Sequence, residues 1–361
     1  MDNKIRVLII GSDLSVKGGI TSVIKSFLES NINGVEFKLL PTYIEGSNLR
    51  KINFYLKSLI KYIKAILKKD FDIAHIHMSY KGSFFRKLFI IKINNMFNIK
   101  SILHLHGSEF EVFYESSCFI VKKLIKNIFD SSDCVIVLGD KWKRIIGQIS
   151  PNSNIKVFNN SVRIPEYKVK LERNRINILF LGVLIKRKGI YDLIEAIKIL
   201  YDKGVINKNN LKFIIGGIGK EEEKIKELVY KYNLKQYVNL IGWVDGVSKE
   251  KLLMSSQLFI LPSYNEGLPM AILEAMSYGI PVISTDVGSI SEVVMNNITG
   301  SLVETGNCEE LSKAIIELIK DKDTWKEYSN NCKLIIDEKF NDKKYFERIS
   351  NLYNELASRN I

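Results

Sequence analysis

The sequence has 361 residues, of which 46% are hydrophobic and 26% are charged. This composition excludes a disordered chain, and the length fits two domains of ordinary size. No stretch of about 18 uncharged apolar residues occurs, so no segment is predicted to span a bilayer. The start, MDNKIRVLIIGSD, predicts a first core strand and not a signal peptide, because its apolar run is short and lacks a small-residue cleavage site.

The net charge of +13 belongs to the first half of the chain. Residues 1–170 contain 27 Lys and Arg against 14 Asp and Glu, which leaves 26 basic and 26 acidic residues in the remainder. This asymmetry indicates an anionic partner for the first half. Cys118, Cys134, Cys308 and Cys332 form no CxxC pair, which predicts free thiols in a reducing compartment and a cytoplasmic protein.

Apolar segments of the first half alternate with stretches long enough for helices. Four of them predict buried strands, at residues 4–11, 72–78, 101–107 and 133–139. The first is followed by a loop with Gly18 and Gly19 and then by ITSVIKSFLES, which has helical spacing. The alternation predicts a parallel sheet covered by helices on both faces.

A cationic stripe is predicted on a helix over residues 52–69. Its lysines are spaced by four, three and four residues, at Lys57, Lys61, Lys64 and Lys68. Apolar positions turn mostly away from them, at Ile52, Leu56, Leu59, Ile63 and Ile66. With a second basic and aromatic stretch at 82–97, residues 50–100 are typical of peripheral attachment to an anionic membrane. An ordinary surface helix is the alternative.

The strand pattern stops at residues 150–175, where prolines, asparagines and clustered charge predict a linker. It restarts with apolar segments at 176–182, 211–217, 237–242, 256–262 and 281–286. We therefore expect an α/β protein with two doubly wound, Rossmann-like domains, at 1–165 and 166–340. A C-terminal helix at 341–361 is expected to pack back on the first domain. Ligands of such sheets bind beyond the carboxyl ends of the strands, which places the site in a cleft between the domains.

All four histidines fall in HxH pairs on predicted strands, His75 with His77 and His104 with His106. Residues two apart share a face of a strand, so a four-histidine metal site is conceivable. No carboxylate cluster accompanies the pairs, which argues against a metal. His106 precedes Gly107 at a strand end and is therefore the favoured site residue, whereas His75 and His104 are expected to pair within the core.

Two segments of the second half place charged residues between a strand and a helix. Lys186, Arg187 and Lys188 follow the strand of FLGVLIKRKGIYDLI, where cations and free amides would hold a diphosphate. In PSYNEGLPMAILEAM, Glu266 precedes a helix that starts near Pro269 and contains Glu274. A polyhydroxyl ligand would find acceptors and donors there together. The alternatives are a solvated basic loop, a capping Glu266 and an exposed Glu274.

These motifs together resemble glycosyltransferase family 4, whose members are retaining enzymes with the GT-B fold. The resemblance is carried by Gly18-Gly19, HLHGSEF, FLGVLIKRKGIYDLI, PSYNEGLPMAILEAMSYGIPVISTDVGSISEVV and Thr299-Gly300. It runs along nearly the whole chain and is strongest from 176 to 304. It implies that the C-terminal domain binds a nucleotide sugar, usually UDP-linked, and that the N-terminal domain binds the acceptor.

The resemblance also implies a role for individual residues. His106, Lys188 and Glu266 are the catalytic candidates, with His106 against the donor sugar and Lys188 on the diphosphate. Glu109 and His77 are expected on the acceptor side. The remaining donor-binding candidates are Gly18, Gly19, Arg187, Gly242, Trp243, Gly267, Leu268, Met270 and Glu274, of which Glu274 would bind the ribose.

The sequence departs from the family pattern in two places. Val183 stands where the family commonly has an arginine, so Arg187 or Lys186 would have to supply that cation, or Lys188 would act alone. Ser289 and Ser291 stand where glycine and proline are usual, although Glu292 is retained.

The predicted reaction moves a sugar, with retention, from a nucleotide donor to a hydroxyl of a glycan or lipid-linked acceptor, as in surface polysaccharide synthesis. The leaving diphosphate needs preorganised cations, so no metal and no other cofactor are expected. Alternatives are a sugar-nucleotide epimerase, a nicotinamide-dependent oxidoreductase and a non-catalytic basic protein that docks on a membrane. The oxidoreductase is disfavoured because neither the Gly18-Gly19 loop nor the glycine-rich segment IIGGIGKEEE at 214–223 fits a dinucleotide-binding turn. Nucleic acid is disfavoured as a partner, because no known binding motif is present.

Overall fold

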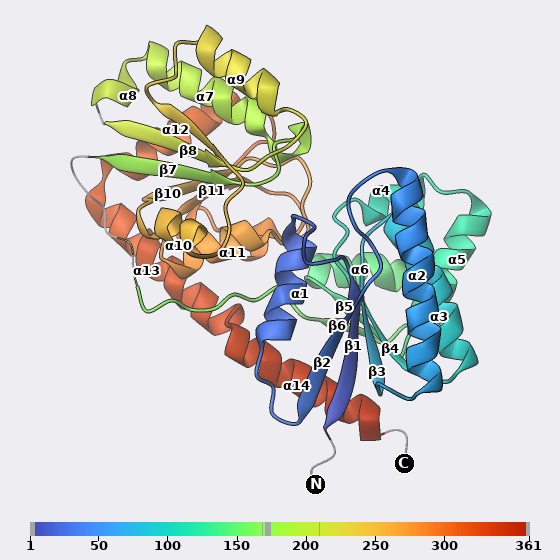
Figure 1. The fold of residues 1–361 in the computed structure, drawn as a ribbon. Coiled ribbons are helices and arrows are strands. Elements are labelled where there is room, and N and C mark those ends of the chain that lie inside the picture. The colour runs from blue at the N-terminus through green and yellow to red at the C-terminus, as the bar shows by residue number, and fades with distance from the viewer. Residues whose placement is uncertain (1–3, 168, 170–174, 209, 359–361) are drawn as a thin grey trace. The chain divides into compact units, whose positions relative to one another are not determined.

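The structure, a computed structural model, describes residues 4–167, 169, 175–208 and 210–358. It consists of two compact units (Figure 1). The first contains the described residues up to Asn160 and those from Lys343 onwards, and the second runs from Ser161 to Asp342. The units divide after residue 160, within the predicted linker and five residues before the predicted domain boundary. The rest of that linker includes residues 168 and 170–174, which lie outside the described residues.

The first unit is built on a six-stranded parallel sheet with the order β2-β1-β3-β4-β5-β6. The strands are β1 (Ile5–Gly11), β2 (Val35–Pro41), β3 (Ile73–Met78), β4 (Lys100–Leu105), β5 (Cys134–Val137) and β6 (Ile155–Val157). All four strands predicted in this half are confirmed. Strands β2 and β6 were not predicted, and β6 lies inside the predicted linker, where it extends the sheet beside β5.

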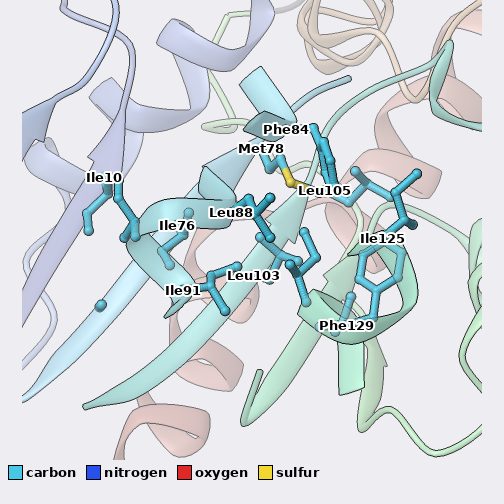
Figure 2. Packing of buried hydrophobic residues seen from close by; sticks show 14 of the residues in the cluster. Ile10, Ile76, Met78, Phe84, Leu88, Ile91, Leu103, Leu105, Ile125 and Phe129 are labelled. Atoms are coloured by element: carbon cyan, nitrogen blue, oxygen red, sulfur yellow. The ribbon is translucent and has the colours of Figure 1, made fainter. Parts of the chain in front are cut away.

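Helices cover both faces of this sheet. They are α1 (Gly19–Glu29), α2 (Asn48–Leu67), α3 (Gly82–Met96), α4 (Phe110–Glu115), α5 (Phe119–Asp130), α6 (Asp140–Ile149) and α14 (Asp342–Ser358). On one face, apolar side chains of β1, β3 and β4 pack against α3 and α5 (Figure 2). This core includes Ile76, Leu88, Leu103 and Phe129.

The other face of the sheet carries aromatic and imidazole rings. Phe27 of α1 is fully buried and packs edge-on against His75 of β3 and Tyr345 of α14. Tyr353, a second tyrosine of α14, forms a 2.7 Å hydrogen bond between its hydroxyl group and Nδ1 of His75. Helix α14 is therefore part of the core of the first unit.

The second unit is also built on a six-stranded parallel sheet, with the strand order β12-β11-β10-β7-β8-β9. Its strands are β7 (Ile176–Leu181), β8 (Leu211–Gly216), β9 (Val238–Gly242), β10 (Leu258–Leu261), β11 (Val282–Thr285) and β12 (Gly300–Val303). The five predicted strands are confirmed, and β12 was not predicted. The two sheets thus bear out the predicted α/β class with two doubly wound halves.

The helices of the second unit connect these strands. They are η1 (Lys186–Lys188), α7 (Ile190–Asp202), α8 (Val205–Lys208), α9 (Glu222–Lys231), α10 (Gly246–Met254), α11 (Met270–Ser277), η2 (Ile290–Glu292), α12 (Cys308–Lys320) and α13 (Lys322–Lys339). In neither unit does any helix of the described residues have the length and apolarity needed to cross a membrane.

Candidate functional site

The predicted residues Lys188 and Glu266 form an ion pair at the carboxyl ends of two adjacent strands. Lys188 ends η1, which follows β7, and Glu266 follows β10, which pairs with β7. The Lys188 Nζ lies 2.5 Å from Glu266 Oε1, and the two side chains are only 16% and 7% exposed. Ser263 Oγ donates to the same oxygen at 2.7 Å. A sheltered carboxylate is thus held by a lysine and a hydroxyl.

Arg187 adds a second cation to this pair. Its Nη1 lies 4.0 Å from Glu266 Oε2 and donates a hydrogen bond to the backbone oxygen of Asn265. Lys186, the other residue considered as a substitute for the arginine missing at Val183, is exposed. Two cations therefore share one carboxylate, and this excess of positive charge suits a diphosphate.

Two glycines allow the backbone segments of this cluster to approach closely. Gly189 has φ +67°, and a Cβ there would clash with the backbone oxygen of Pro262. Gly288 has φ +63°, and a Cβ there would clash with the backbone oxygen of Glu266. Ser289, which follows Gly288, donates its N–H to the oxygen of Gly267 at 2.8 Å. The positions of Lys188 and Glu266 thus depend on residues without side chains.

The other predicted donor-binding residues of the second unit lie on α11 or after β9. Gly267 and Leu268 are buried in the loop before α11, which begins at Met270. Glu274 lies in the second turn of α11, where its Oε1 accepts a hydrogen bond from Lys249 Nζ of α10 at 2.6 Å. Glu274 is thus neither fully solvent-exposed nor paired with the Lys188 cluster.

Gly242 and Trp243 stand at the end of β9. The backbone oxygen of Gly242 accepts a 2.7 Å hydrogen bond from Gly217, which follows β8. Trp243 Nε1 donates to Asp245 at 3.2 Å. These two residues therefore mark the carboxyl end of the sheet's edge strand.

In the first unit, all four histidines lie on one face of the sheet. Strands β3 and β4 pair with His77 opposite His104, which the sequence does not reveal. His75 Nε2 lies 3.2 Å from His104 Nδ1, so the predicted pairing in the core is confirmed. His77 Nδ1 lies 2.9 Å from His106 Nε2. Burial lowers the pKa of all four imidazoles, so they are neutral at pH 7.

Three of these histidines offer ligand atoms that could hold a metal ion. Ligand atoms of His75, His77 and His104 lie within 4.8 Å of one another. Both ring nitrogens of His75 already have partners, Tyr353 and His104, while Nε2 of His77 and of His104 have none among the described residues. The hydrogen-bonded pairs account for most of the cluster without a metal.

Some of the remaining predicted residues of the first unit line a cavity at the carboxyl ends of β1 and β3. Gly18 and Gly19 line this cavity together with His77. His106 directly follows β4 and contacts His77, whereas Glu109 accepts a hydrogen bond from Tyr80. The structure thus brings Gly18, Gly19, His77 and His106 together.

Sequence reasoning missed three polar residues of these sites. Lys249 and Ser263 hold the two glutamates, and no pattern in the sequence singled them out. Lys87 was counted within the basic surface stretch at 82–97, and this assignment is wrong for Lys87. The structure buries it at 2% exposure, because position 87 lies on the face of α3 that includes Phe84 and Leu88. A charged residue in an apolar helical stripe was the available signal.

Comparisons with known proteins bear on the family and the fold. Residues 164–334 match the family model described as glycosyl transferases group 1. A curated relative, the Escherichia coli UDP-Gal:alpha-D-GlcNAc-diphosphoundecaprenol alpha-1,3-galactosyltransferase, is 29% identical over 324 residues, which cover 84% of this chain and 80% of the relative.

Solved structures resemble the whole chain. Sucrose-phosphate synthase from Thermosynechococcus elongatus has a TM-score of 0.79 at 18% identity and covers 99% of this chain and 100% of its own. Anabaena HepE in complex with UDP has a TM-score of 0.76 at 16% identity, with 97% and 100% covered. At such identities these likenesses show a shared fold.

The two parallel sheets and these likenesses define the GT-B fold. The family match over residues 164–334, which lie in the second unit, together with the curated relative identifies a glycosyltransferase. The predicted enzyme class, a glycosyltransferase, is thereby confirmed.

Proposed function

We propose that the chain is a retaining glycosyltransferase of family 4 that transfers a sugar from a UDP-sugar to a hydroxyl of a lipid-linked glycan, in surface polysaccharide synthesis. The observation that carries the proposal is the cluster of Lys188, Arg187 and Glu266 at the carboxyl ends of β7 and β10. A nucleoside diphosphate would find two cations there, beside a carboxylate that can accept hydrogen bonds from sugar hydroxyls. The name of the Escherichia coli relative specifies a UDP-sugar and a diphosphate-linked lipid, which supports this donor and acceptor class.

In the proposed reaction, the acceptor hydroxyl attacks the anomeric carbon as the bond to the diphosphate breaks. The oxygen of the leaving diphosphate accepts the proton of the hydroxyl on the same face of the sugar. Lys188 and Arg187 stabilise the negative charge that develops on the diphosphate, which is the effect that a metal ion has in other transferases. Glu274 is assigned to the ribose, and His106 to the donor sugar. No metal or other cofactor is needed.

The experiment combines ligand binding with product analysis. A thermal-shift panel of nucleotides and sugar nucleotides identifies the donor, because a bound ligand stabilises the folded state by mass action. NMR of the product then gives the anomeric configuration, with EDTA present in a parallel reaction. Conversion of the donor without any acceptor would instead identify an epimerase. Inversion would refute the retaining assignment, and abolition by EDTA would refute the metal-free one.

We also propose that α2 attaches the protein to the cytoplasmic face of an anionic membrane. The lysines Lys57, Lys61, Lys64 and Lys68 are exposed and form no ion pair with any described residue. Of the apolar positions predicted to turn away from them, Leu59 and Ile66 pack towards the core, whereas Ile52, Leu56 and Ile63 are exposed.

The exposed apolar positions of α2 form a stripe of their own beside the lysines. They recur every three or four residues, with exposed fractions of 39–70%, at Leu49, Ile52, Leu56, Ile60, Ile63 and Leu67. Phe85, Phe89 and Met96 of α3 are exposed as well. Helical stripes of apolar and cationic residues side by side are the pattern of interfacial helices.

Vesicle sedimentation tests this attachment. Replacement of the four lysines by glutamine should weaken binding to vesicles with anionic lipid about fivefold per charge, since each contributes about 1 kcal/mol. The matched control replaces four exposed lysines of the second unit, Lys224, Lys231, Lys235 and Lys313. Equal binding by both variants would refute the assignment to α2.

A further inference from the structure

The first unit contains a cavity that is lined by cations and by no carboxylate of the described residues. Its volume is about 260 Å³. It is bounded by the β1–α1 loop, by the residues after β2 and β3, and by the start of α3. The polar side chains around it include Lys17, Thr42, His77, Ser83, Arg86 and Lys87.

Lys87 is the most unusual of these residues. Its side chain is 2% exposed, donates a hydrogen bond to Thr42 Oγ1 and forms no ion pair with any described residue. Burial, with Arg86 nearby, holds its pKa well below the usual range. A buried lysine without a counter-charge is unfavourable unless a bound group supplies negative charge.

Arg86 and His77 offer further donors to such a group. The guanidinium of Arg86 stacks over the ring of Tyr43 at 4.8 Å, and its buried Nε has no partner among the described residues. His77 is 2% exposed, and its Nε2 is also without a partner in the described part of the chain. Two cations and an imidazole with unused hydrogen-bonding capacity therefore line one cavity.

The backbone around the cavity favours an anion as well. Helix α1 begins at Gly19 with no side chain capping it and no acidic residue in its first turn. Gly18 and Gly19 line the cavity, and a Cβ at either would meet no atom within 4 Å. The positive end of the helix is thus open to a ligand.

We propose that this cavity binds a phosphoryl group of the acceptor, namely the diphosphate that links the acceptor glycan to its lipid. This inference rests on the proposed function, which assigns the diphosphate of the donor to Lys188 and Arg187 of the second unit. Lys87 and Arg86 would bind the phosphoryl oxygens. Lys87 then determines specificity for a phosphorylated acceptor.

A second cavity favours the acceptor over the donor as the source of the phosphoryl group. It has a volume of about 600 Å³ and is lined by Leu49, Arg50 and Lys57 of α2, beside the stripe assigned to the membrane. Ser15 lines this cavity, and the next residue, Val16, lines the smaller one. The loop after β1 therefore joins the lipid-facing helix to the cationic cavity.

The test compares two acceptors that share one sugar, a glycosyl diphosphate on a short lipid and a phosphate-free alkyl glycoside. Wild-type enzyme is expected to prefer the diphosphate in kcat/KM. Lys87→Met should lower this preference at least tenfold, chiefly through the KM of the diphosphate acceptor. Lys92→Met is the matched control, because Lys92 is exposed on the same helix. An unchanged preference in Lys87→Met would overturn the inference.

Two further readouts keep the inference separate from the proposed function. A rise in the KM of the donor, with the acceptor preference unchanged, would assign the cavity to the donor and overturn the proposal. If wild type transfers no sugar to either acceptor, the proposed function fails, and stabilisation by inorganic pyrophosphate decides the inference. Lys87→Met must then lose part of the thermal shift that Lys92→Met keeps. Arg86→Gln, at a less buried position, repeats each measurement should Lys87→Met not fold.

Discussion

Replacing Glu266 by glutamine tests whether the Lys188 pair stabilises the second unit. At 2.5 Å and an effective dielectric constant of about 20, the attraction between the two charges is about 7 kcal/mol before desolvation. Taking a carboxylate that is 7% exposed out of water offsets several kcal/mol of this. Glutamine keeps an oxygen that can accept from Lys188 and Ser263. We therefore expect a net loss of about 3 kcal/mol in the free energy of unfolding.

Calorimetry measures this loss as a shift in Tm. For a unit of this size, each kcal/mol lowers Tm by about 2–4 °C, so Glu266→Gln should unfold about 6–12 °C below wild type. The control is Glu309→Gln, because Glu309 pairs with Lys203 at 3.0 Å but is 59% exposed. Such surface pairs contribute less than about 1 kcal/mol. A Tm for Glu266→Gln equal to that of the control would refute the reasoning.

Three other predictions concern the backbone, the histidines and α14. Gly189→Ala should lower Tm by far more than Gly204→Ala, because both have φ +67° but only the former would clash with backbone, and equal shifts would contradict this. Burial lowers the pKa of His75 to about 3, whereas in the unfolded chain it is about 6.5. Because the unfolded chain therefore takes up the proton first, the free energy of unfolding should be highest above about pH 6.5 and should fall as the pH is lowered. The loss per buried histidine is at most about 1.4 kcal/mol per pH unit, and urea titrations between pH 7 and 4.5 that show no loss would refute it. Tyr353→Phe, which removes the hydrogen bond to His75, should cost about 1–3 kcal/mol in the same titration at pH 7, and no change would mean that the bond is not stabilising.

Most of the strands that the sequence predicted are buried on both faces, whereas β9 is buried only at Val238. Segments such as residues 73–78 and 258–261 are continuously apolar or neutral because helices cover both sides of the sheet. The missed strands lack this signal. In β2, residues 35–39 alternate between intermediate and exposed positions at the edge of the sheet, and β6 has only three residues.

The candidate site was predicted where a motif is local in sequence. Glu266 and Lys188 were found because each belongs to a contiguous strand-to-helix segment. The histidine cluster was only partly predicted, because the register that sets His77 opposite His104 is a property of two strands far apart in the chain. Lys87 was misassigned for a similar reason, since its burial depends on packing against residues such as Thr42.

The path of the chain has a consequence for how the protein is made. The first unit begins at the N-terminus but takes α14 from the end of the described chain, and Tyr353 of that helix completes the environment of His75. During synthesis, the whole second unit leaves the ribosome before this helix does. The part of the first unit that α14 covers, which includes His75 and Phe27, therefore stays exposed until the end of the chain has been made.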